Sequence, residues 1–595
     1  MRIFQFILVL GASLFLFLST NSAQSKKRKA NYVNIVIPKK DTTIAGTKYY
    51  RLAANTLPGS RVTLNGKKLK VYRSGAVVNL MKLDIGKNVF VLRSYGPHGK
   101  KITKSFVIIR KDVKLRTTPK DSLVIEDVQM LPDKDVWLDQ NDILEVRIKG
   151  TPNGYASFMN GIPMQELPVD QTNGIGGIYV GTYKVKETDF LVDEPIKFRL
   201  ENGNGEVVEK ESKAKVSFLP KMFPRIAVTR DERPYLNYGL GTNRLGGAKL
   251  SFIEPGIKLM INGRVGDQYR VKLTDDFEAW IPMEQVTLLP LGTPLPKTLT
   301  GSWNVYGDKK YDYVVVNLSE KIPYSTTQEV DPTRIIVNLY GATSNTNWIT
   351  QHLSSKNIKN VTYRQVSKDL FRIIIEPVYK QIWGYGISYN GNSLVIKIKR
   401  QPKRLNIKNL TFVIDAGHGG SNYGALGATG LKEKDFTLKT AKYLKKALRR
   451  KGARVVMTRT DDSFSLNSKR LETVLESGAD ILISIHANSI GTSTNPLKAR
   501  GTSTYYKHIC FRPLSQKIYK RMLELGLQPF GNIGNFNFTL NSPTEIPNVL
   551  VETAFISNPL DEMKLISNSF KRRIADKIVK GVEDFLRDVK KNKLN

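Results

Sequence analysis

The chain contains a single cysteine, Cys510, among its 595 residues. One thiol cannot form an intramolecular disulfide, and it cannot supply the cysteine ligands of a zinc finger. A small scaffold held together by disulfides and a cysteine-based zinc finger are therefore both excluded. An oxidising compartment is not excluded, because large domains are stable without disulfides.

The apolar run at the start of the chain, residues 3–18, is shorter than the roughly 20 residues that a membrane-spanning helix needs. It follows one basic residue, Arg2, and precedes small polar residues that suit a signal peptidase. We predict a secretory signal peptide over residues 1–23, with an uncleaved membrane anchor as the alternative. The predicted location is the periplasm or cell envelope, without stable membrane insertion once the signal is cleaved.

Acidic residues are in the minority: 53 stand against 92 basic residues, for a formal net charge of +39. The basic side chains are scattered, with short clusters only at residues 26–29 and 590–593. Because an exported protein rarely meets nucleic acid, we predict no nucleic-acid partner. Two explanations stay open, namely attraction to an anionic surface of the envelope and a generally basic proteome.

The first half of the chain shows short strands and turns with almost no helical periodicity. The stretch "VTLNGKKLKVY" predicts a hairpin turning at Asn65-Gly66, and a second such pair stands at Asn262-Gly263. These patterns are typical of immunoglobulin-like β-sandwiches, followed by a unit that resembles the small Src-homology-3-like barrels of bacteria. That barrel could bind cell-wall peptides or act as a spacer. The predicted modules are residues 32–115, 120–220 and 225–290.

Residues 300–402 form a further all-β block. The stretches "DPTRIIVNLYG" and "LFRIIIEP", with a final hairpin at Asn390-Gly391, resemble the AMIN module that precedes many cell-wall amidases. The resemblance implies a targeting role at the cell wall, and a rigid spacer is the alternative.

The pattern changes near residue 405, where strands begin to alternate with amphipathic helices. Helices that close with Gly452 and Gly478 before β-branched strands indicate βαβ units. The predicted fold class is therefore a multidomain chain, with all-β sandwich and barrel modules followed by a C-terminal α/β domain. We place that domain at residues 408–590 and expect its sheet to be mostly parallel.

Two of the five histidines, His418 and His486, follow or end apolar strands of this domain. Strand ends that meet at one edge of a sheet would bring the two imidazoles together, which predicts a shared metal. Glu433, at the start of the first helix, is the candidate third ligand, although alone it could simply complement the helix dipole. This set predicts Zn²⁺.

A metal-activated water needs a base to receive its proton. Glu552 ends the apolar run "NVLVE", where a buried charge is costly unless it has a function. We predict Glu552 as the catalytic general base, which later protonates the leaving amine.

The motifs "DAGHGG", "EKDFTL", "SIHAN" and "VLVETAFISN" closely resemble those of the zinc-dependent N-acetylmuramoyl-L-alanine amidases. The resemblance implies that His418, Glu433 and His486 bind zinc and that Glu552 is catalytic. We predict Arg470 and Asn488 as substrate contacts, while a structural bridge stays open for Arg470.

The predicted function is hydrolysis of the amide bond between N-acetylmuramic acid and L-alanine in peptidoglycan. Peptidoglycan is thus the expected partner, and an activator at the envelope or division site is a further expectation. Two alternatives stay open: a wall-binding protein with a degenerate amidase domain, and a zinc peptidase that acts within the stem peptide.

Overall fold

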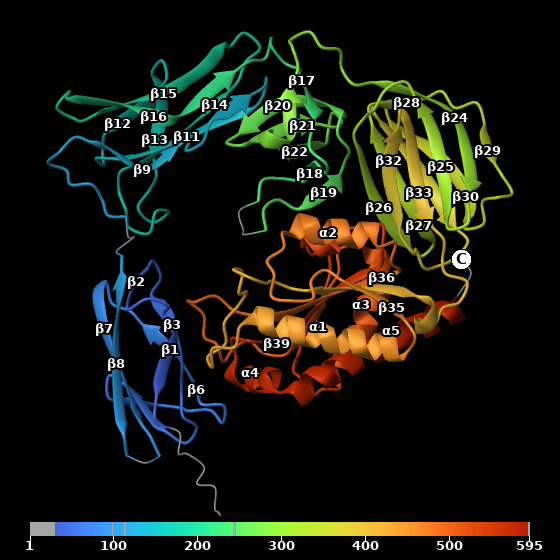
Figure 1. Ribbon diagram of the computed structural model, residues 1–595. Helices are drawn as coiled ribbons and strands as arrows, with labels where there is room; N and C mark the ends of the chain where they lie inside the picture. The colour runs from blue at the N-terminus through green and yellow to red at the C-terminus, as the bar shows by residue number, and fades with distance from the viewer. Residues whose placement is uncertain (1–29, 98, 112–114, 242–244, 593–595) are drawn as a thin grey trace, which may run out of the picture.

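The computed structural model describes residues 30–97, 99–111, 115–241 and 245–592 (Figure 1). The predicted signal peptide, residues 1–23, lies outside the described residues. Among the described residues, no helix combines the length and the apolar character needed to cross a membrane.

The N-terminal module is a β-sandwich with a three-stranded and a five-stranded sheet. Its core contains the fully buried side chains of Leu52, Val62, Leu92 and Ile108. The hairpin predicted at Asn65-Gly66 is confirmed: it joins β4 to β5, and both turn residues have positive φ, at 46° and 84°. The strands are β1 (Val33–Ile37), β2 (Thr42–Ala45), β3 (Tyr49–Thr56), β4 (Arg61–Leu64), β5 (Lys67–Leu69), β6 (Ala76–Lys82), β7 (Gly86–Tyr95) and β8 (Lys101–Arg110).

The next two modules share one 15-stranded sheet, because β10 pairs with β16 in parallel and with β20 antiparallel. The first contributes β9 (Ile125–Leu131), β10 (Val136–Leu138), β11 (Ile143–Gly150), β12 (Tyr155–Phe158), β13 (Ile162–Glu166), β14 (Ile178–Lys184), β15 (Leu191–Glu201) and β16 (Val207–Phe218). The second contributes β17 (Arg225–Thr229), β18 (Tyr235–Asn237), β19 (Lys249–Phe252), β20 (Lys258–Val265), β21 (Gln268–Lys272), β22 (Glu278–Pro282), the 3-10 helix η1 (Met283–Gln285) and β23 (Val286–Leu288).

The hairpin predicted at Asn262-Gly263 is wrong, because both residues lie inside β20 and the chain turns at Gly266 instead. The reason is tertiary. A Cβ atom on Gly263 would lie 2.8 Å from Nε of Arg270, whose guanidinium reaches across to Asp142 of the preceding module. The glycine thus makes room for a side chain that joins two modules.

Residues 298–399 form two further sheets, with six and four strands. The hairpin predicted at Asn390-Gly391 is confirmed between β32 and β33. Trp303 and Phe371 lie in a hydrophobic cluster that also contains residues of the preceding module, strands β17–β23, and Phe511 of the last domain. The strands are β24 (Thr298–Gly307), β25 (Tyr311–Leu318), β26 (Tyr324–Val330), β27 (Thr333–Tyr340), β28 (Ala342–Ser344), β29 (Ile349–Gln351), β30 (Ile358–Ser367), β31 (Leu370–Pro377), β32 (Tyr385–Asn390) and β33 (Ser393–Lys399).

The C-terminal domain has a six-stranded sheet in the order β35-β34-β36-β39-β37-β38. Its strands are β34 (Thr411–Ala416), β35 (Arg454–Met457), β36 (Ile481–Asn488), β37 (Thr502–Tyr505), β38 (Pro529–Ile533) and β39 (Asn548–Phe555). Four pairings are parallel, and the pairing of β37 with β39 is antiparallel. The sheet is therefore mixed, and the expectation of mostly parallel strands is confirmed in part.

Helices cover both faces of this sheet (Figure 1). They are α1 (Glu433–Arg450), α2 (Asn467–Glu476), α3 (Arg512–Leu523), α4 (Pro559–Ile566) and α5 (Asn568–Lys591), with 3-10 turns η2 (Ile407–Asn409), η3 (Ile509–Phe511) and η4 (Thr539–Asn541). Phe412 and Ile414 pack in the cluster of α1, α3 and α5, whereas Val413 and Leu482 pack against α2 on the other face. This alternation is the period of two that a strand imposes on its side chains.

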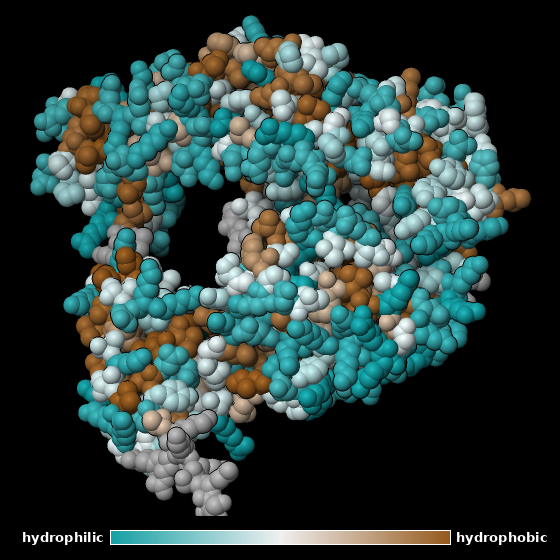
Figure 2. All heavy atoms as spheres, viewed as in Figure 1, coloured by the Kyte–Doolittle hydropathy of each residue, from teal (hydrophilic) through white to brown (hydrophobic). Residues whose placement is uncertain are grey.

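The N-terminal sandwich folds back onto the C-terminal domain. The Asn55 side chain donates to the carbonyl of Ala428 at 3.0 Å, and the amide of Arg51 donates to the carbonyl of Thr492 at 2.6 Å. Ala428 is buried among apolar side chains of the sandwich, including Ile37 and Val78. The modules thus close into a ring, and Figure 2 shows the opening between the first sandwich, the second sandwich and the C-terminal domain.

Candidate metal centre and active site

The two predicted histidines lie at the ends of neighbouring parallel strands. Ala416 at the end of β34 pairs with Ile485 of β36. The residues that follow these two positions, including His418 and His486, therefore lie at one edge of the sheet. His418 has a φ of 62°, a backbone conformation that non-glycine residues rarely adopt. A Cβ atom on Gly417 would lie 2.3 Å from Cε1 of His486, so the glycine makes room for that ring.

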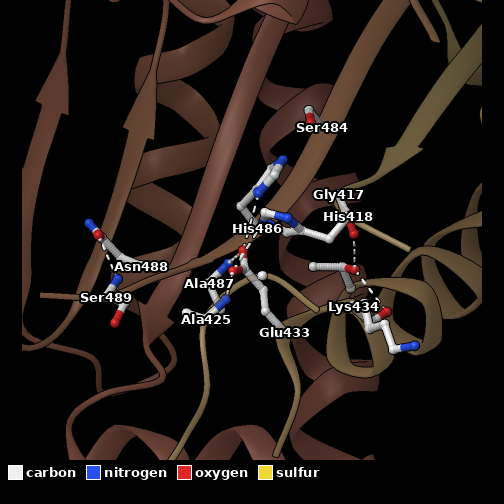
Figure 3. Close-up of polar contacts among 12 residues, drawn as sticks. Gly417, His418, Ala425, Glu433, Lys434, Ser484, His486, Ala487, Asn488 and Ser489 are labelled. Carbon is white, nitrogen blue, oxygen red and sulfur yellow. Dashed lines mark hydrogen bonds and ion pairs between the residues drawn. The ribbon is translucent and has the colours of Figure 1, made fainter. Parts of the chain in front are cut away.

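Glu433 completes the cluster at the start of α1. Its Oε2 lies 3.1 Å from Nε2 of His418, and its Oε1 lies 3.1 Å from Nδ1 of His486 (Figure 3). The same carboxylate accepts from the amides of Ala425, at 2.8 Å, and Ala487, at 3.0 Å. Its oxygens are therefore aimed at the two imidazoles and at the backbone amides beside them.

One ligand atom from each of these three residues lies within 4.8 Å of the other two. Two imidazole nitrogens and one carboxylate oxygen are a donor set that suits Zn²⁺ with one position left for water or substrate. The residues present therefore fit the predicted ion.

The carboxylate of the cluster is held in its ionised form. Burial opposes this, but hydrogen bonds from His418 and His486 lower the pKa of Glu433. Burial likewise opposes a charge on His418, yet the Glu433 carboxylate raises the pKa of that imidazole. A cation that binds here would take the place of the proton on His418.

A buried ion pair supports the turn that carries His418. Nη1 of Arg470 donates to Oδ1 of Asp415 at 2.7 Å, and Nη2 donates to the carbonyl of His418 at 2.5 Å. Oδ2 of Asp415 lies 4.0 Å from Nε2 of His486. Burial would raise the pKa of Asp415, but the Arg470 guanidinium holds it below its usual value. Arg470 thus forms the structural bridge that the sequence left open, and its contact with substrate stays a prediction.

Two supporting residues were absent from the predicted site. The buried Arg459 donates to the carbonyls of Ala416, at 2.8 Å, and Gly417, at 3.0 Å. Oδ1 of Asn422 lies 3.0 Å from Nδ1 of His418 and orients that ring. Arg459 follows strand β35, next to β34, and Asn422 lies four residues after His418 in a glycine-rich turn. Their positions in the sequence, after a neighbouring strand and close to His418, were the features from which a supporting role could have been predicted.

Glu552 lies on β39, directly beside β36. It pairs in register with His486, and partners in register project from the same face of a sheet. Its residue exposure is 8%. Asn488, two residues beyond His486, donates to the hydroxyl of Tyr505 at 3.4 Å. The catalytic role of Glu552 and the substrate contact of Asn488 stay predictions.

The cluster opens into a cleft of about 160 Å³. Its walls include His418 and His486, together with Phe464, Phe538 and Leu540. The Phe538 ring stacks on the His486 ring, with centroids 6.4 Å apart and an interplanar angle of 11°. Apolar groups therefore form part of the wall beside the centre.

Replacing Arg470 by methionine should destabilise the strand edge by about 3–5 kcal/mol, because Asp415 would keep a buried charge without its partner. Hydrogen exchange of the β34 and β36 amides in the full chain would measure this loss. Lys469→Met is the matched control, since the Lys469 side chain is 70% exposed and pairs with Glu472 at the surface. Equal protection in the two variants would contradict the role assigned to Arg470.

The fold and the site define a class: an α/β domain with a candidate metal centre at the ends of its parallel strands. Residues 412–584 match the family model described as N-acetylmuramoyl-L-alanine amidase, and residues 304–407 match the AMIN domain. The chain therefore carries a C-terminal domain of this amidase family, with an AMIN domain before it. The resemblances to the amidases and to the AMIN module are confirmed, and the resemblance of residues 225–290 to a Src-homology-3-like barrel stays a prediction.

Curated and solved relatives match the same part of the chain. The "Probable cell wall amidase LytH" of Staphylococcus aureus is 34% identical over 180 residues, which is 30% of this chain. The chain spans 58% of the length of that relative. The catalytic domain of the amidase CwlV from Bacillus (Paenibacillus) polymyxa is 32% identical, with 30% of this chain and 98% of that chain covered and a TM-score of 0.28. The amidase CwlD from Clostridioides difficile, solved in complex with the GerS lipoprotein, is 26% identical. The match covers 30% of this chain and 100% of the CwlD chain, with a TM-score of 0.27.

Proposed function

We propose that this protein is a zinc-dependent hydrolase that cleaves the amide bond between N-acetylmuramic acid and L-alanine in peptidoglycan. The observation that carries the proposal is the joint position of His418, Glu433 and His486 within the segment that matches the amidase family. The presence of Glu552 on the adjacent strand, in register with His486, supports a hydrolytic role.

His418, Glu433 and His486 would hold the zinc ion. When bound, zinc lowers the pKa of a coordinated water and polarises the substrate carbonyl. Glu552 would accept the proton of the attacking water and then deliver it to the amide nitrogen as the C–N bond breaks. The products are the lactyl carboxylate on the glycan and a peptide with a free amino terminus. The Asp415–Arg470 pair and Arg459 would keep the two imidazoles in place during this reaction.

The setting of the enzyme is also a proposal. Export through the signal at residues 1–23 would bring it to the periplasm or cell envelope, where the AMIN domain would target it to the wall. The net charge of +39 favours an anionic wall polymer as partner. An activator at the envelope or division site would be a further partner.

Digestion of purified peptidoglycan by the zinc-loaded full chain would test the reaction. We expect free stem peptides that begin with L-alanine, identified by mass spectrometry. Treatment with a chelator should abolish their release, and added Zn²⁺ should restore it. Fragments cut within the stem would instead indicate a peptidase, and an intact wall despite bound zinc would indicate a wall-binding protein.

A further inference from the structure

A second cavity, of about 180 Å³, lies where three modules meet. The module of strands β17–β23 contributes Lys249 and Glu254, the AMIN domain contributes Tyr324, and the C-terminal domain contributes Lys507 and Glu545. None of these residues belongs to the metal cluster. The cavity exists only because the three modules pack together, and sites between domains are common places for small ligands.

One wall of this junction cavity is basic. Nζ of Lys507 donates to the carbonyl of Lys249 at 3.3 Å and to Oδ1 of Asn537 at 3.1 Å. Nζ of Lys249 lies 3.2 Å from the centroid of the Tyr235 ring and donates to Oδ1 of Asn237 at 3.1 Å. Within the described part of the chain, neither lysine forms a salt bridge with a carboxylate. Burial lowers the pKa of each lysine to about 8, and at Lys507 the nearby Lys249 adds to the effect.

The lining also contains the carboxylates of Glu254 and Glu545. Oε2 of Glu254 accepts only from the amide of Tyr389, at 2.8 Å, among the described contacts. Oε2 of Glu545 is buried and has no hydrogen-bond partner among the described residues. Burial raises the pKa of Tyr324 most, both carboxylates raise it further, and Arg233, another residue of the lining, lowers it. The lining of the cavity therefore carries both positive and negative charge.

A single segment joins this cavity to the metal cleft. Phe538 and Leu540 line the cleft, whereas Ser542 and Glu545 line the junction cavity. Asn537, at the start of the segment, accepts from Lys507 and donates to the carbonyl of Gly247 at 2.9 Å. A ligand in the junction cavity would thus sit on the segment that flanks the proposed reaction site.

We propose that the junction cavity binds a short zwitterionic peptide, with its carboxylate toward Lys249 and Lys507 and its ammonium toward Glu254 and Glu545. A cavity of about 180 Å³ has room for a ligand of about the size of a dipeptide. This choice of ligand rests on the proposed function, because hydrolysis of the muramoyl amide releases peptides that carry both charges. The binding site itself rests on the cavity and its charges.

Binding of L-alanyl-γ-D-glutamate to the zinc-loaded full chain, measured by calorimetry, would test this proposal. We expect the double variant Lys249→Met/Lys507→Met to weaken binding at least about tenfold, since it removes two charge-assisted contacts. Lys397→Met is the matched control, because Nζ of Lys397 also lies over a tyrosine ring, Tyr311, at 4.0 Å. It should bind the dipeptide like the wild type, and His486→Ala should do so as well.

A comparison with the N-acetylated dipeptide needs no variant, and loss of the ammonium should weaken binding by a similar factor. Equal binding to the double variant and to Lys397→Met would overturn the proposal, as would loss of binding in His486→Ala or no binding to the wild type. Normal digestion of peptidoglycan without dipeptide binding would refute this inference alone. Dipeptide binding that depends on the lysines, in a protein that releases no stem peptides, would refute the proposed function alone.

Discussion

Glutamine in place of Glu552 should lower kcat about 10²–10⁴-fold, the usual contribution of a general base, while zinc stays bound. The amide side chain keeps the size of the glutamate but cannot accept the proton of the attacking water. Glu552 also lies outside the cluster of ligand atoms, so the metal site should persist. Release of stem peptides from soluble peptidoglycan fragments would give kcat, and elemental analysis would give the zinc content.

Glu524→Gln provides the control for this variant. Glu524 ends α3 at the surface, where it pairs with Arg521 and Lys577, and its loss should leave kcat unchanged. Full activity of Glu552→Gln would remove Glu552 from the reaction. Loss of zinc from that variant would instead assign Glu552 to the metal site.

Alanine in place of His418 should remove zinc from the protein and lower kcat/KM about 10³-fold. The substitution leaves only Glu433 and His486 as donors, fewer than the three that a catalytic zinc site needs. This decrease in kcat/KM corresponds to a loss of several kcal/mol of transition-state stabilisation by the metal, because each factor of ten in rate equals about 1.4 kcal/mol. Zinc content after dialysis and the rate of stem-peptide release would measure the two effects.

His352→Ala is the matched control, because His352 is exposed in the AMIN domain and lies outside the metal cluster. It should keep both zinc and activity. Retention of zinc and of full activity by His418→Ala would contradict the assignment of this ligand. Partial recovery of the variant in excess Zn²⁺ would support it, since a weakened site fills by mass action.

The sequence by itself determined the local elements and the positions of the chemical groups. Asn65-Gly66 predicted its hairpin correctly because this pair favours the backbone of the turn, whereas at Asn262-Gly263 tertiary contacts overrode the same preference. His418 and His486 could be placed together because parallel strands present their carboxyl ends at the same edge. Glu433 followed from the donor set that zinc requires, and its contacts with both imidazoles agree with that reasoning.

Tertiary structure alone decided the features that depend on residues far apart in the chain. Periodicity could not reveal that Gly263 makes room for Arg270, or that β37 runs antiparallel to β39. It also could not show that Asn55 contacts the loop before Glu433, or that Lys249 and Lys507 share one cavity. Hydrophobic patterns record which face of an element is buried, but not which partner covers it. The partner is chosen by side-chain packing between modules, and that packing exists only in the folded chain.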